Sequence, residues 1–506
     1  MQGKWPKHVK KLALGGDEMY KYSNGQISLE DFKQPIGMNL KESNRWVKKA
    51  QTIPWLEIEK RYAALFKNRK GNVAKPLRMA LGACIVQAEY GYSDEEITLQ
   101  LQENPYLQYF CGYLEYDDNR LPFDPSLMVY FRKRLTPEIL GEINEMIIEK
   151  AVKEAPMPLE DENDYTDHND DNDEDDKPEP PQNGGTMIVD ATCAPSQISF
   201  PQDTKLLNSA REATEELIDT LHVPGTKKPR TYRKKAHKNF LKISRTRKPT
   251  AKKIRKAIGK QLGYIRRNLE NIKIISENSA KLTIRQAEQL KTIEKIYEQQ
   301  KYMFDNRVHS VPDRIVSLSQ PWIRPILRGK AKAPVEFGAK LDISVVEGWT
   351  RLEFISFDAY NESTKLTEMI ERYRERTGHY PARVLADKIY RNRDNLKFCS
   401  EHRIRLSGPA LGRPKLGEKE DIRNKKQNYL DECERIEVER KFSLAKRKCG
   451  LGLIVARLSE TARHCIAMSV IVLNLKKVLC AFFVFLYCLL ITHHLPQRNL
   501  KFVFVQ

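Results

Sequence analysis

The sequence predicts an α/β domain that is interrupted by a helical insertion and preceded by an all-α region. Apolar residues recur at helical spacing through much of residues 44–152. Short apolar patterns typical of strands then occur at residues 187–200, 335–341, 352–357 and 382–386. Residues 204–308, between the first two strand patterns, again show helical spacing. Strands separated by helices indicate an α/β core, here with a long insertion after its first strand.

Residues 1–157 form the predicted all-α domain. Ser93 and Glu96 have the spacing of a capping box, in which Ser93 is the N-cap and Glu96 lies three residues later. A basic helix follows at residues 130–135, and it carries the candidate DNA contacts Arg132 and Arg134. A plain helical bundle with a solvated basic face fits the same pattern equally well.

The composition favours a polyanionic partner. The chain has 87 Lys and Arg and 67 Asp and Glu among its 506 residues, which gives a net charge of +20. Nucleic acid is the common partner of such a chain, although a basic protein on a ribosome or a membrane surface would have a similar balance. Nine scattered cysteines without metal-ligand spacing argue against a zinc site or a disulfide framework. Because the N-terminus also lacks an apolar signal segment, we expect a cytoplasmic protein.

Two further segments have distinctive compositions. The acidic run at residues 160–181 has too few apolar residues to fold, so residues 158–185 are predicted to form a solvated linker. A calcium loop is disfavoured there because Gly and Glu do not occur at the required offsets. The apolar run 478–491, in the C-terminal segment 476–506, is shorter than the roughly 18 residues of a membrane span. It therefore predicts a buried or interfacial helix and no membrane partner.

The predicted insertion is strongly basic. No acidic residue occurs between Asp219 and Glu270, whereas Lys and Arg are frequent, among them Arg233, Lys234 and Lys235. Apolar residues of this stretch recur at steps of three and four, so one side of a helix can pack while the other sides stay cationic. Such a surface binds DNA phosphates without reading the base sequence. A solvated helical arm is the alternative.

Three acidic residues are the candidates for chemistry. Asp190 and Asp387 each follow an apolar strand pattern, where a carboxylate is costly to bury unless it is paired. Glu439 lies in a helical segment that places Arg435 and Lys446 on its face, although an ordinary charged helix would show this pattern too. Three converging carboxylates would hold divalent metal ions, and the two cations would hold phosphate oxygens.

Other acidic residues near these strands have structural interpretations. Asp342 and Asp358 lie beside strand patterns, where Asp commonly serves turns, caps and hydrogen bonds. Glu437 is two residues from Glu439 and therefore points to another face of the helix.

The candidate residues resemble motifs of a known family, the DDE transposases of bacterial insertion sequences, in the group of insertion sequences four and five. Asp190 in residues 189–192 (VDAT) is similar to the family's first Asp motif. Asp387 in residues 386–390 (ADKIY) is similar to the second, in which the neighbouring Lys388 is a phosphate-binding candidate.

The third motif of that family is a Tyr-x2-Arg-x3-Glu-x6-Lys signature. Arg435, Glu439 and Lys446 fit it, and Glu432 stands at the Tyr position. The resemblance covers residues 30–475 and includes further segments, at residues 93–96, 104–110, 123–126, 131–134, 319–322, 328–330, 337–340 and 358–362.

This resemblance implies an RNase H-like catalytic core, made of residues 186–203 and 309–475 on either side of the basic insertion 204–308. It also implies two Mg²⁺ ions, for which Mn²⁺ would substitute. Asp190 and Asp387 would share the metals, and Glu439 would complete the second site. Water would attack a phosphodiester at the end of the element, and the freed 3′-hydroxyl would then attack target DNA.

The implied partner is double-stranded DNA, as terminal inverted repeats and as target, bound by a homodimer in the synaptic complex. Two alternatives stay open at this point. A nuclease of the same fold would cut without joining. A degenerate copy would only bind DNA, and Glu432 in place of the signature Tyr is consistent with such drift.

Overall fold

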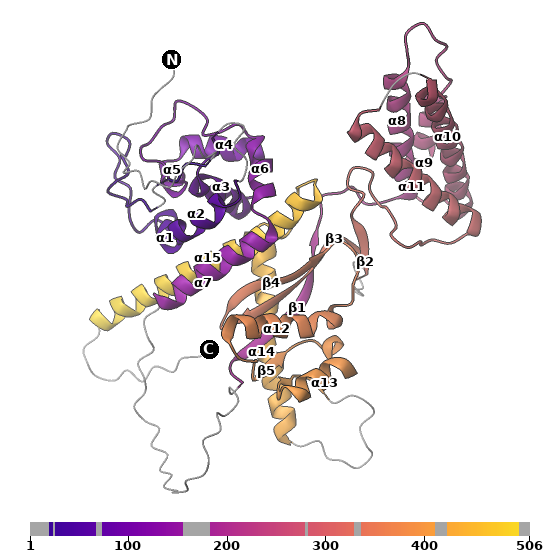
Figure 1. Cartoon of the computed structure of the whole chain (residues 1–506). Coiled ribbons are helices and arrows are strands. Elements are labelled where there is room, and N and C mark those ends of the chain that lie inside the picture. Colours follow the sequence, from indigo (N-terminus) through magenta and orange to yellow (C-terminus); the bar gives the residue numbers. More distant parts are fainter. Residues whose placement is uncertain are drawn as a thin grey trace.

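The computed structural model describes residues 20–23, 26–66, 73–154, 183–278, 282–327, 335–409 and 422–494. Within these residues a helical N-terminal region is followed by a mixed sheet with helices on both faces, and a further group of helices stands apart from the sheet (Figure 1). The acidic linker expected at 158–185 lies almost entirely outside the described residues.

The N-terminal region is helical, as predicted. Its helices are α1 (Arg45–Thr52), α2 (Trp55–Ala63), α3 (Leu77–Tyr90), α4 (Asp94–Glu103), α5 (Pro105–Phe110), α6 (Leu127–Arg134) and α7 (Pro137–Lys153). Side-chain caps explain where some of them begin. Asn44 Oδ1 accepts a hydrogen bond from the backbone N–H of Trp46 at 2.8 Å, and Ser93 Oγ accepts one from that of Glu96 at 3.1 Å.

Six strands of the described residues form one sheet. They are β1 (Thr186–Pro195), β2 (Arg324–Leu327), β3 (Val335–Val346), β4 (Trp349–Ser356), β5 (Arg383–Leu385) and β6 (Arg405–Leu406). The order is β2-β3-β1-β5-β6, and β4 also pairs with β3. Because β1 is antiparallel to β3 and parallel to β5, the sheet is mixed. Gly338 permits the close approach of β3 to β1, since a Cβ there would lie 2.0 Å from the carbonyl oxygen of Ala194.

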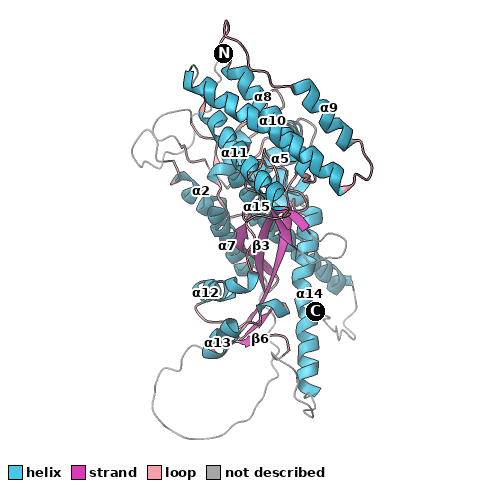
Figure 2. Cartoon of the chain, turned by 90° about the vertical axis from the view of Figure 1, so that its right-hand side faces the viewer, coloured by secondary structure: helices cyan, strands magenta, loops and turns pink. Residues whose placement is uncertain are grey.

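The two faces of the sheet carry different helices (Figure 2). One face is covered by η1 (Glu362–Lys365), α12 (Leu366–Thr377), η2 (Lys388–Tyr390) and α13 (Arg393–Glu401). Val189 of β1 shares a core with Met369 of α12 on this face. The opposite face is covered by α14 (Ile422–Lys448), where Ile188 shares a core with Val438. Successive side chains of β1 therefore point alternately to α12 and to α14, as in any strand.

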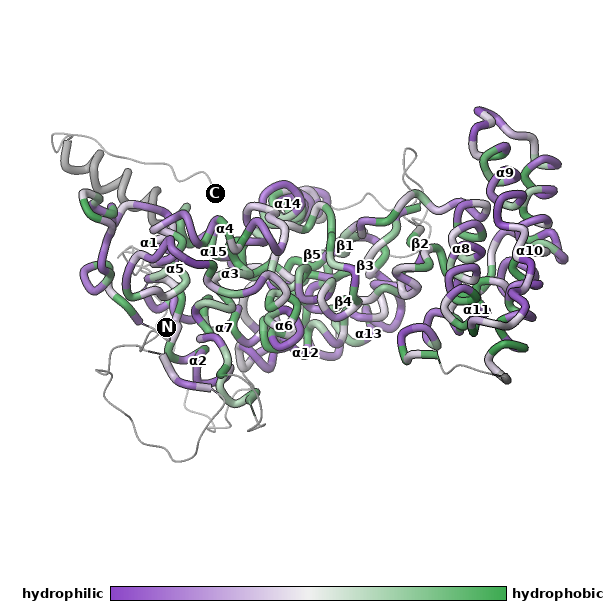
Figure 3. The backbone as a smooth tube through the Cα atoms, turned by 90° about the horizontal axis from the view of Figure 1, so that it is seen from above, coloured by the Kyte–Doolittle hydropathy of each residue, from purple (hydrophilic) through white to green (hydrophobic). Residues whose placement is uncertain are grey.

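Four helices between β1 and β2 form a separate packing unit, which we call the basic module. They are α8 (Asp203–Leu221), α9 (Arg233–Ser244), α10 (Ala251–Asn278) and α11 (Ile284–Asn306). Leu207 and Ile218 of α8, Ile265 of α10 and Ile296 of α11 are fully buried in a core distinct from that of the sheet. Seen from above, the basic module lies at one end of the molecule and the N-terminal helices lie at the other (Figure 3).

The last helix, α15 (Ser459–His494), joins the N-terminal region to the sheet. It packs along α7 and also contacts α3 and β4, within one continuous hydrophobic core. Asn474 fixes this junction, because its amide donates to Asn144 Oδ1 and to the carbonyl oxygen of Thr350, each at 2.8 Å. The domain boundary expected at residues 475/476 therefore falls inside a packed helix. Side chains beyond residue 480, which include most of the apolar run 478–491, lie outside the described part.

Among the described residues, no helix combines the length and the apolar character needed to cross a membrane.

His464 makes the α15 junction sensitive to acid. It is buried, its Nδ1 lies 2.7 Å from the carbonyl oxygen of Leu135, and burial lowers its pKa from 6.5 to about 4. Between these pH values the unfolded chain binds a proton that the folded chain excludes, so stability is lost as the pH falls through this window. As the pH falls from 6.5 to 4, we expect His464 to lower the free energy of unfolding by up to about 3 kcal/mol. Denaturant titration at several pH values measures this change. The free energy of unfolding of His464→Gln should fall less over the same pH range. A fall equal to that of the wild type would show that protonation of His464 is not its cause.

Candidate active site

The pairing of two parallel strands brings Asp190 and Asp387 together. Ile188 of β1 is registered with Leu385 of β5, and each Asp lies two residues beyond its registered strand position. Asp190 lies within β1, whereas Asp387 lies just beyond the end of β5. Neighbouring strands are about 4.8 Å apart, so the two acidic residues occupy equivalent positions just past the paired segment of the two strands. This arrangement unites two residues that are far apart in the sequence.

Each of the two Asp side chains accepts a hydrogen bond from the backbone N–H of the next residue in the chain. Asp190 Oδ1 accepts from the backbone N–H of Ala191 at 2.8 Å. Asp387 Oδ1 accepts from the backbone N–H of Lys388 at 2.6 Å and thereby caps η2. Asp387 and Lys388 are both exposed at this turn. A carboxylate and an ammonium group therefore face solvent side by side at the end of β5.

Charged pairs fix α14 against this end of the sheet. Arg405 of β6 binds Asp431 through hydrogen bonds of 2.6 and 2.7 Å. Arg383 of β5 binds Glu434 through hydrogen bonds of 3.0 and 2.7 Å. Two-pronged Arg–carboxylate pairs impose geometry as well as attraction. They set the register of the helix that carries Glu439.

Arg435 connects the strand carboxylate to the helix carboxylate. Its Nη1 lies 3.7 Å from Asp190 Oδ2, and its Nη2 lies 3.6 Å from Glu439 Oε1. The side chain of Glu439 is 58% exposed, whereas that of Asp190 is 20% exposed. One cation thus stands between a largely buried acid and an accessible one.

The environment of Asp190 disfavours its negative charge. Burial raises the pKa of Asp190 to about 6, the backbone hydrogen bond from Ala191 and the charge of Arg435 oppose this shift, and the charges of Asp387 and Glu362 add to it. An opposite charge within a few ångströms stabilises an ionised carboxylate. A bound cation would therefore relieve repulsion at this position.

A cavity of about 270 Å³ opens beside Asp387. It is lined by Ala386, Asp387, Lys388, Ser407, Gly408, Pro409, Asn428, Asp431, Glu432 and Arg435. Lys388 and Arg435 are cations suited to phosphate oxygens, and they stand next to the carboxylate of Asp387. The cavity thus offers phosphate-binding groups directly beside a candidate metal ligand.

The donor chemistry of Asp190, Asp387 and Glu439 fits Mg²⁺ or Mn²⁺, because these hard ions prefer oxygen ligands. In the part of the chain that the structure describes, no three acidic, His or Cys side chains converge tightly enough to enclose an ion. Mg²⁺ is commonly held by one or two carboxylates, with water and substrate phosphates as its other ligands. Asp190 and Asp387 on neighbouring strands, together with the unfavourable negative charge of Asp190, fit such an open site.

Family models match two parts of the chain. Residues 384–476, which contain Asp387 and Glu439, match the model of a transposase DDE domain, and residues 35–134 match that of a transposase domain (DUF772). The chain thus contains a transposase DDE domain and a second transposase domain. This confirms the resemblance noted in the sequence. Asp190 lies outside both matched segments.

One curated relative of the transposase is an uncharacterized protein, ORF8 in the nfe locus of Rhizobium meliloti. It is 26% identical over 184 residues, which are 36% of this chain and 76% of the relative. No solved structure matches the chain. The roles of individual site residues in this transposase therefore stay predictions.

The two Arg candidates of the N-terminal region are engaged inside the transposase. Arg132 is buried, and its guanidinium donates to both carboxylate oxygens of Asp94 at 2.7 and 2.6 Å. The structure contradicts the predicted DNA contact of Arg132, because its buried guanidinium forms an ion pair that joins α6 to the start of α4. Arg134 is half-buried, with its guanidinium 4.8 Å from the ring centre of Phe66.

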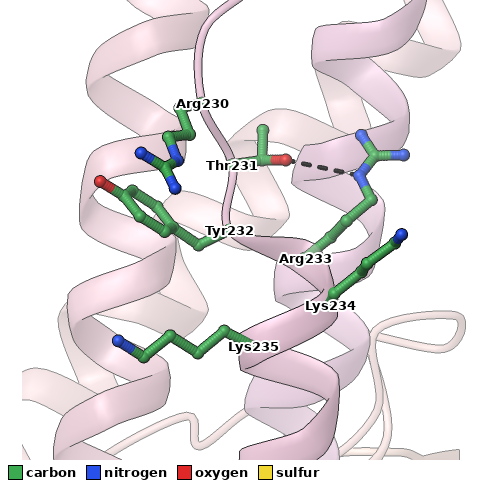
Figure 4. Close-up of a pocket in the computed structure, with 6 residues that line it drawn as sticks. All are labelled: Arg230, Thr231, Tyr232, Arg233, Lys234 and Lys235. Carbon is green, nitrogen blue, oxygen red and sulfur yellow. Dashed lines mark hydrogen bonds between the residues drawn. The ribbon is translucent and has the colours of Figure 1, made fainter.

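The candidates in the basic module differ in their availability (Figure 4). Arg233 donates to both carboxylate oxygens of Asp219 at 2.9 and 2.8 Å, so it helps to hold α9 against α8. Lys234 and Lys235 are exposed and extend in different directions from α9. They line an open cavity of about 450 Å³ that is formed by residues 230–235 and contains no acidic side chain. Within this module Lys234 and Lys235 are exposed, whereas the guanidinium of Arg233, although also exposed, is paired with Asp219.

Sequence reasoning missed the position of Asp342. It lies within β3, is fully buried, and accepts a hydrogen bond from the Tyr360 hydroxyl at 3.0 Å. Burial raises its pKa to about 7, the Tyr360 hydrogen bond and the charge of Lys340 oppose this, and the charges of Glu362 and Asp190 add to it. The available signal was that apolar residues stand on both sides of Asp342, at Leu341 and Ile343, and an acid in such a position is rarely buried without a partner.

Proposed function

We propose that the chain is an active transposase that cleaves DNA at the ends of an insertion sequence and transfers the freed strand ends to target DNA. The observation that carries this proposal is the equivalent placement of Asp190 and Asp387, each two residues beyond the last paired position of the parallel strands β1 and β5. Arg435, which contacts both Asp190 and Glu439, supports a common site for all three acids. The neighbouring cavity offers cations for the phosphates of a DNA strand.

Asp190, Asp387 and Glu439 would hold the divalent ions, Mg²⁺ or Mn²⁺. Such a metal pair, when bound, stabilises the attacking and the leaving oxygen of an in-line displacement. Lys388 and Arg435 would hold phosphate oxygens of the strand in the cavity, with Arg435 exchanging its carboxylate contacts for phosphate. Because water and then a DNA 3′-hydroxyl act as nucleophiles, the protein contributes positioning and charge and needs no nucleophilic side chain.

Further DNA contacts are assigned to two regions. Lys446, seven residues beyond Glu439 on α14, would hold a phosphate farther along the strand. Lys234 and Lys235 of the basic module would bind the backbone of duplex DNA without reading its sequence. The DNA partners would be the terminal inverted repeats and the target, and a homodimer would hold two element ends together.

The test is a strand-cleavage and strand-transfer assay on DNA that carries the terminal repeats of the element. Mg²⁺ or Mn²⁺ should support nicking at the repeat ends and joining to a second DNA, and EDTA should abolish both reactions. Nicking without joining would indicate a nuclease of the same fold. DNA binding without either reaction would indicate a degenerate transposase. Each of these two outcomes would overturn the proposal.

A further inference from the structure

A buried polar cluster lies on the α12 face of the sheet. Asp342 of β3 is registered with Ala191 of β1, two residues beyond Val189, whose side chain belongs to the α12 core. Side chains two residues apart on a strand share a face. Asp342 therefore points away from α14, on the face of the sheet opposite to the side chain of Asp190, which is carried by the neighbouring strand.

Hydrogen bonds and an ion pair hold the segment after β4 over this cluster. The Tyr360 hydroxyl donates to Asp342 Oδ2 at 3.0 Å. Lys340, two residues before Asp342, donates to the carbonyl oxygen of Tyr360 at 3.0 Å and forms an ion pair with Glu362. Asp342 Oδ2 thus has the Tyr360 hydroxyl as its donor, and Lys340 holds Tyr360 in place.

Two buried atoms of the cluster have no hydrogen-bond partner among the described residues. They are Asp342 Oδ1 and the hydroxyl oxygen of Tyr390, and both side chains are fully buried. Burial raises the pKa of the Tyr390 hydroxyl far above its usual range, and the charge of Asp342 is the largest of the neighbouring charges that add to this shift. Leaving a buried polar group unpaired costs about 1–3 kcal/mol, so two neighbouring groups of this kind indicate a shared partner.

Tyr390 is tied directly to the turn that presents Asp387. Its backbone N–H donates to the carbonyl oxygen of Asp387 at 3.0 Å, and it is the last residue of η2. Asn395 donates to the carbonyl oxygens of Tyr390 and Ser363, each at 2.8 Å, and so joins η2 to η1. The placement of the Tyr390 side chain therefore constrains the position of Asp387.

We propose that Asp342 and Tyr390 are positioning residues for Asp387, joined by one ordered water between Asp342 Oδ1 and the Tyr390 hydroxyl. A buried water is stable where it has two to four polar partners, and these two groups supply the first two. The bridge would anchor η2 to β3 from the face opposite α14. This inference rests on the proposed function, because it assigns Asp387 to metal binding.

Tyr390→Phe provides the first test because it removes only the hydroxyl group. Groups that orient metal ligands typically change metal affinity or activity by 10- to 100-fold when they are removed. We expect the Mn²⁺ concentration for half-saturation to rise about tenfold. Electron paramagnetic resonance of free Mn²⁺ in the absence of DNA, and strand cleavage, should both report this change. Asp342→Asn should have a similar effect.

Tyr373→Phe is the matched control. Tyr373 is buried on the same face, and its hydroxyl donates to the carbonyl oxygen of Gly184 at 2.8 Å. This variant loses a buried hydroxyl away from the cluster, so it should lose some stability while its Mn²⁺ dependence stays that of the wild type. If Tyr373→Phe and Tyr390→Phe raised the Mn²⁺ concentration for half-saturation equally, the effect would come from general destabilisation. That result would overturn the proposal.

A double variant tests the shared water. If one bridge joins the two groups, Tyr390→Phe combined with Asp342→Asn should raise the Mn²⁺ requirement no more than either change alone. Multiplied effects, or wild-type Mn²⁺ binding in Tyr390→Phe, would refute the bridge. A wild-type protein that neither binds Mn²⁺ nor cleaves DNA would instead refute the proposed function. Wild-type activity together with unaffected variants would refute the positioning role alone.

Discussion

Asp190→Asn is expected to lower metal-dependent strand cleavage by about 10³-fold or more while the protein stays folded. A metal ion contributes several kcal/mol to transition-state stabilisation, and each 1.4 kcal/mol corresponds to tenfold in rate. Asn keeps the size of the side chain but loses the charge that would hold the ion. Because burial raises the pKa of Asp190 to about 6, its charge opposes folding at neutral pH, so the variant should be at least as stable. Cleavage of labelled repeat DNA and thermal unfolding measure the two effects.

Variants of the other two acids and a matched control complete this experiment. Asp387→Asn and Glu439→Gln should show losses of the same order. Asp358→Asn changes the same charge outside the site, where the Asp358 side chain is 72% exposed and lies 3.6 Å from Arg324, so cleavage should stay at the wild-type rate. Wild-type cleavage by Asp190→Asn would show that the catalytic assignment is wrong.

Replacing Lys234, Lys235 and Lys238 by Gln is expected to weaken binding to DNA of any sequence by roughly 10²- to 10³-fold at about 0.1 M salt. All three are exposed on α9, where Ala236 is the buried residue. Each phosphate contact adds about 0.9 to the slope of log affinity against log salt, so three contacts would lower the slope by about 2.7. Fluorescence anisotropy across a range of salt concentrations measures both quantities.

The control for this surface lies in the same module. Lys291, Lys295 and Lys301 are exposed on α11 among acidic residues, and Lys301 pairs with Asp305 at 2.6 Å. Replacing these three by Gln makes the same change in net charge but should leave the salt slope nearly unchanged. A wild-type slope for the α9 variant would show that this face of the basic module does not contact phosphates.

Much of the sheet and its helices followed from local patterns. A strand was predicted at 352–357 and β4 spans Trp349–Ser356, and a strand was predicted at 382–386 and β5 spans Arg383–Leu385. Apolar spacing reports such elements because it reflects which side of the element is buried. The continuity of α15 across residue 475 was not predicted, since it depends on packing against α7 and β4.

In the candidate site, too, contacts with distant segments could not be predicted from local patterns. Arg132 was expected on a DNA-binding face, but its partner Asp94 is 38 positions away and no local pattern links the two. Asp342 was expected to serve a turn, a cap or a hydrogen bond. It does accept a hydrogen bond from Tyr360, but the pairing of β3 with β1 also buries it completely. In both cases the decisive fact is burial against a distant segment, which residue spacing does not encode.

The amino-acid sequence was sufficient to predict many helices and strands, the basic stretch without acids, and the motifs that carry the family relationship. These features depend only on residue type and spacing along the chain. Which acidic residues lie close together could not be predicted in this way, because it depends on strand register and helix packing. Parallel pairing of β1 and β5 sets Asp190 beside Asp387, and the docking of α14 puts Arg435 between Asp190 and Glu439.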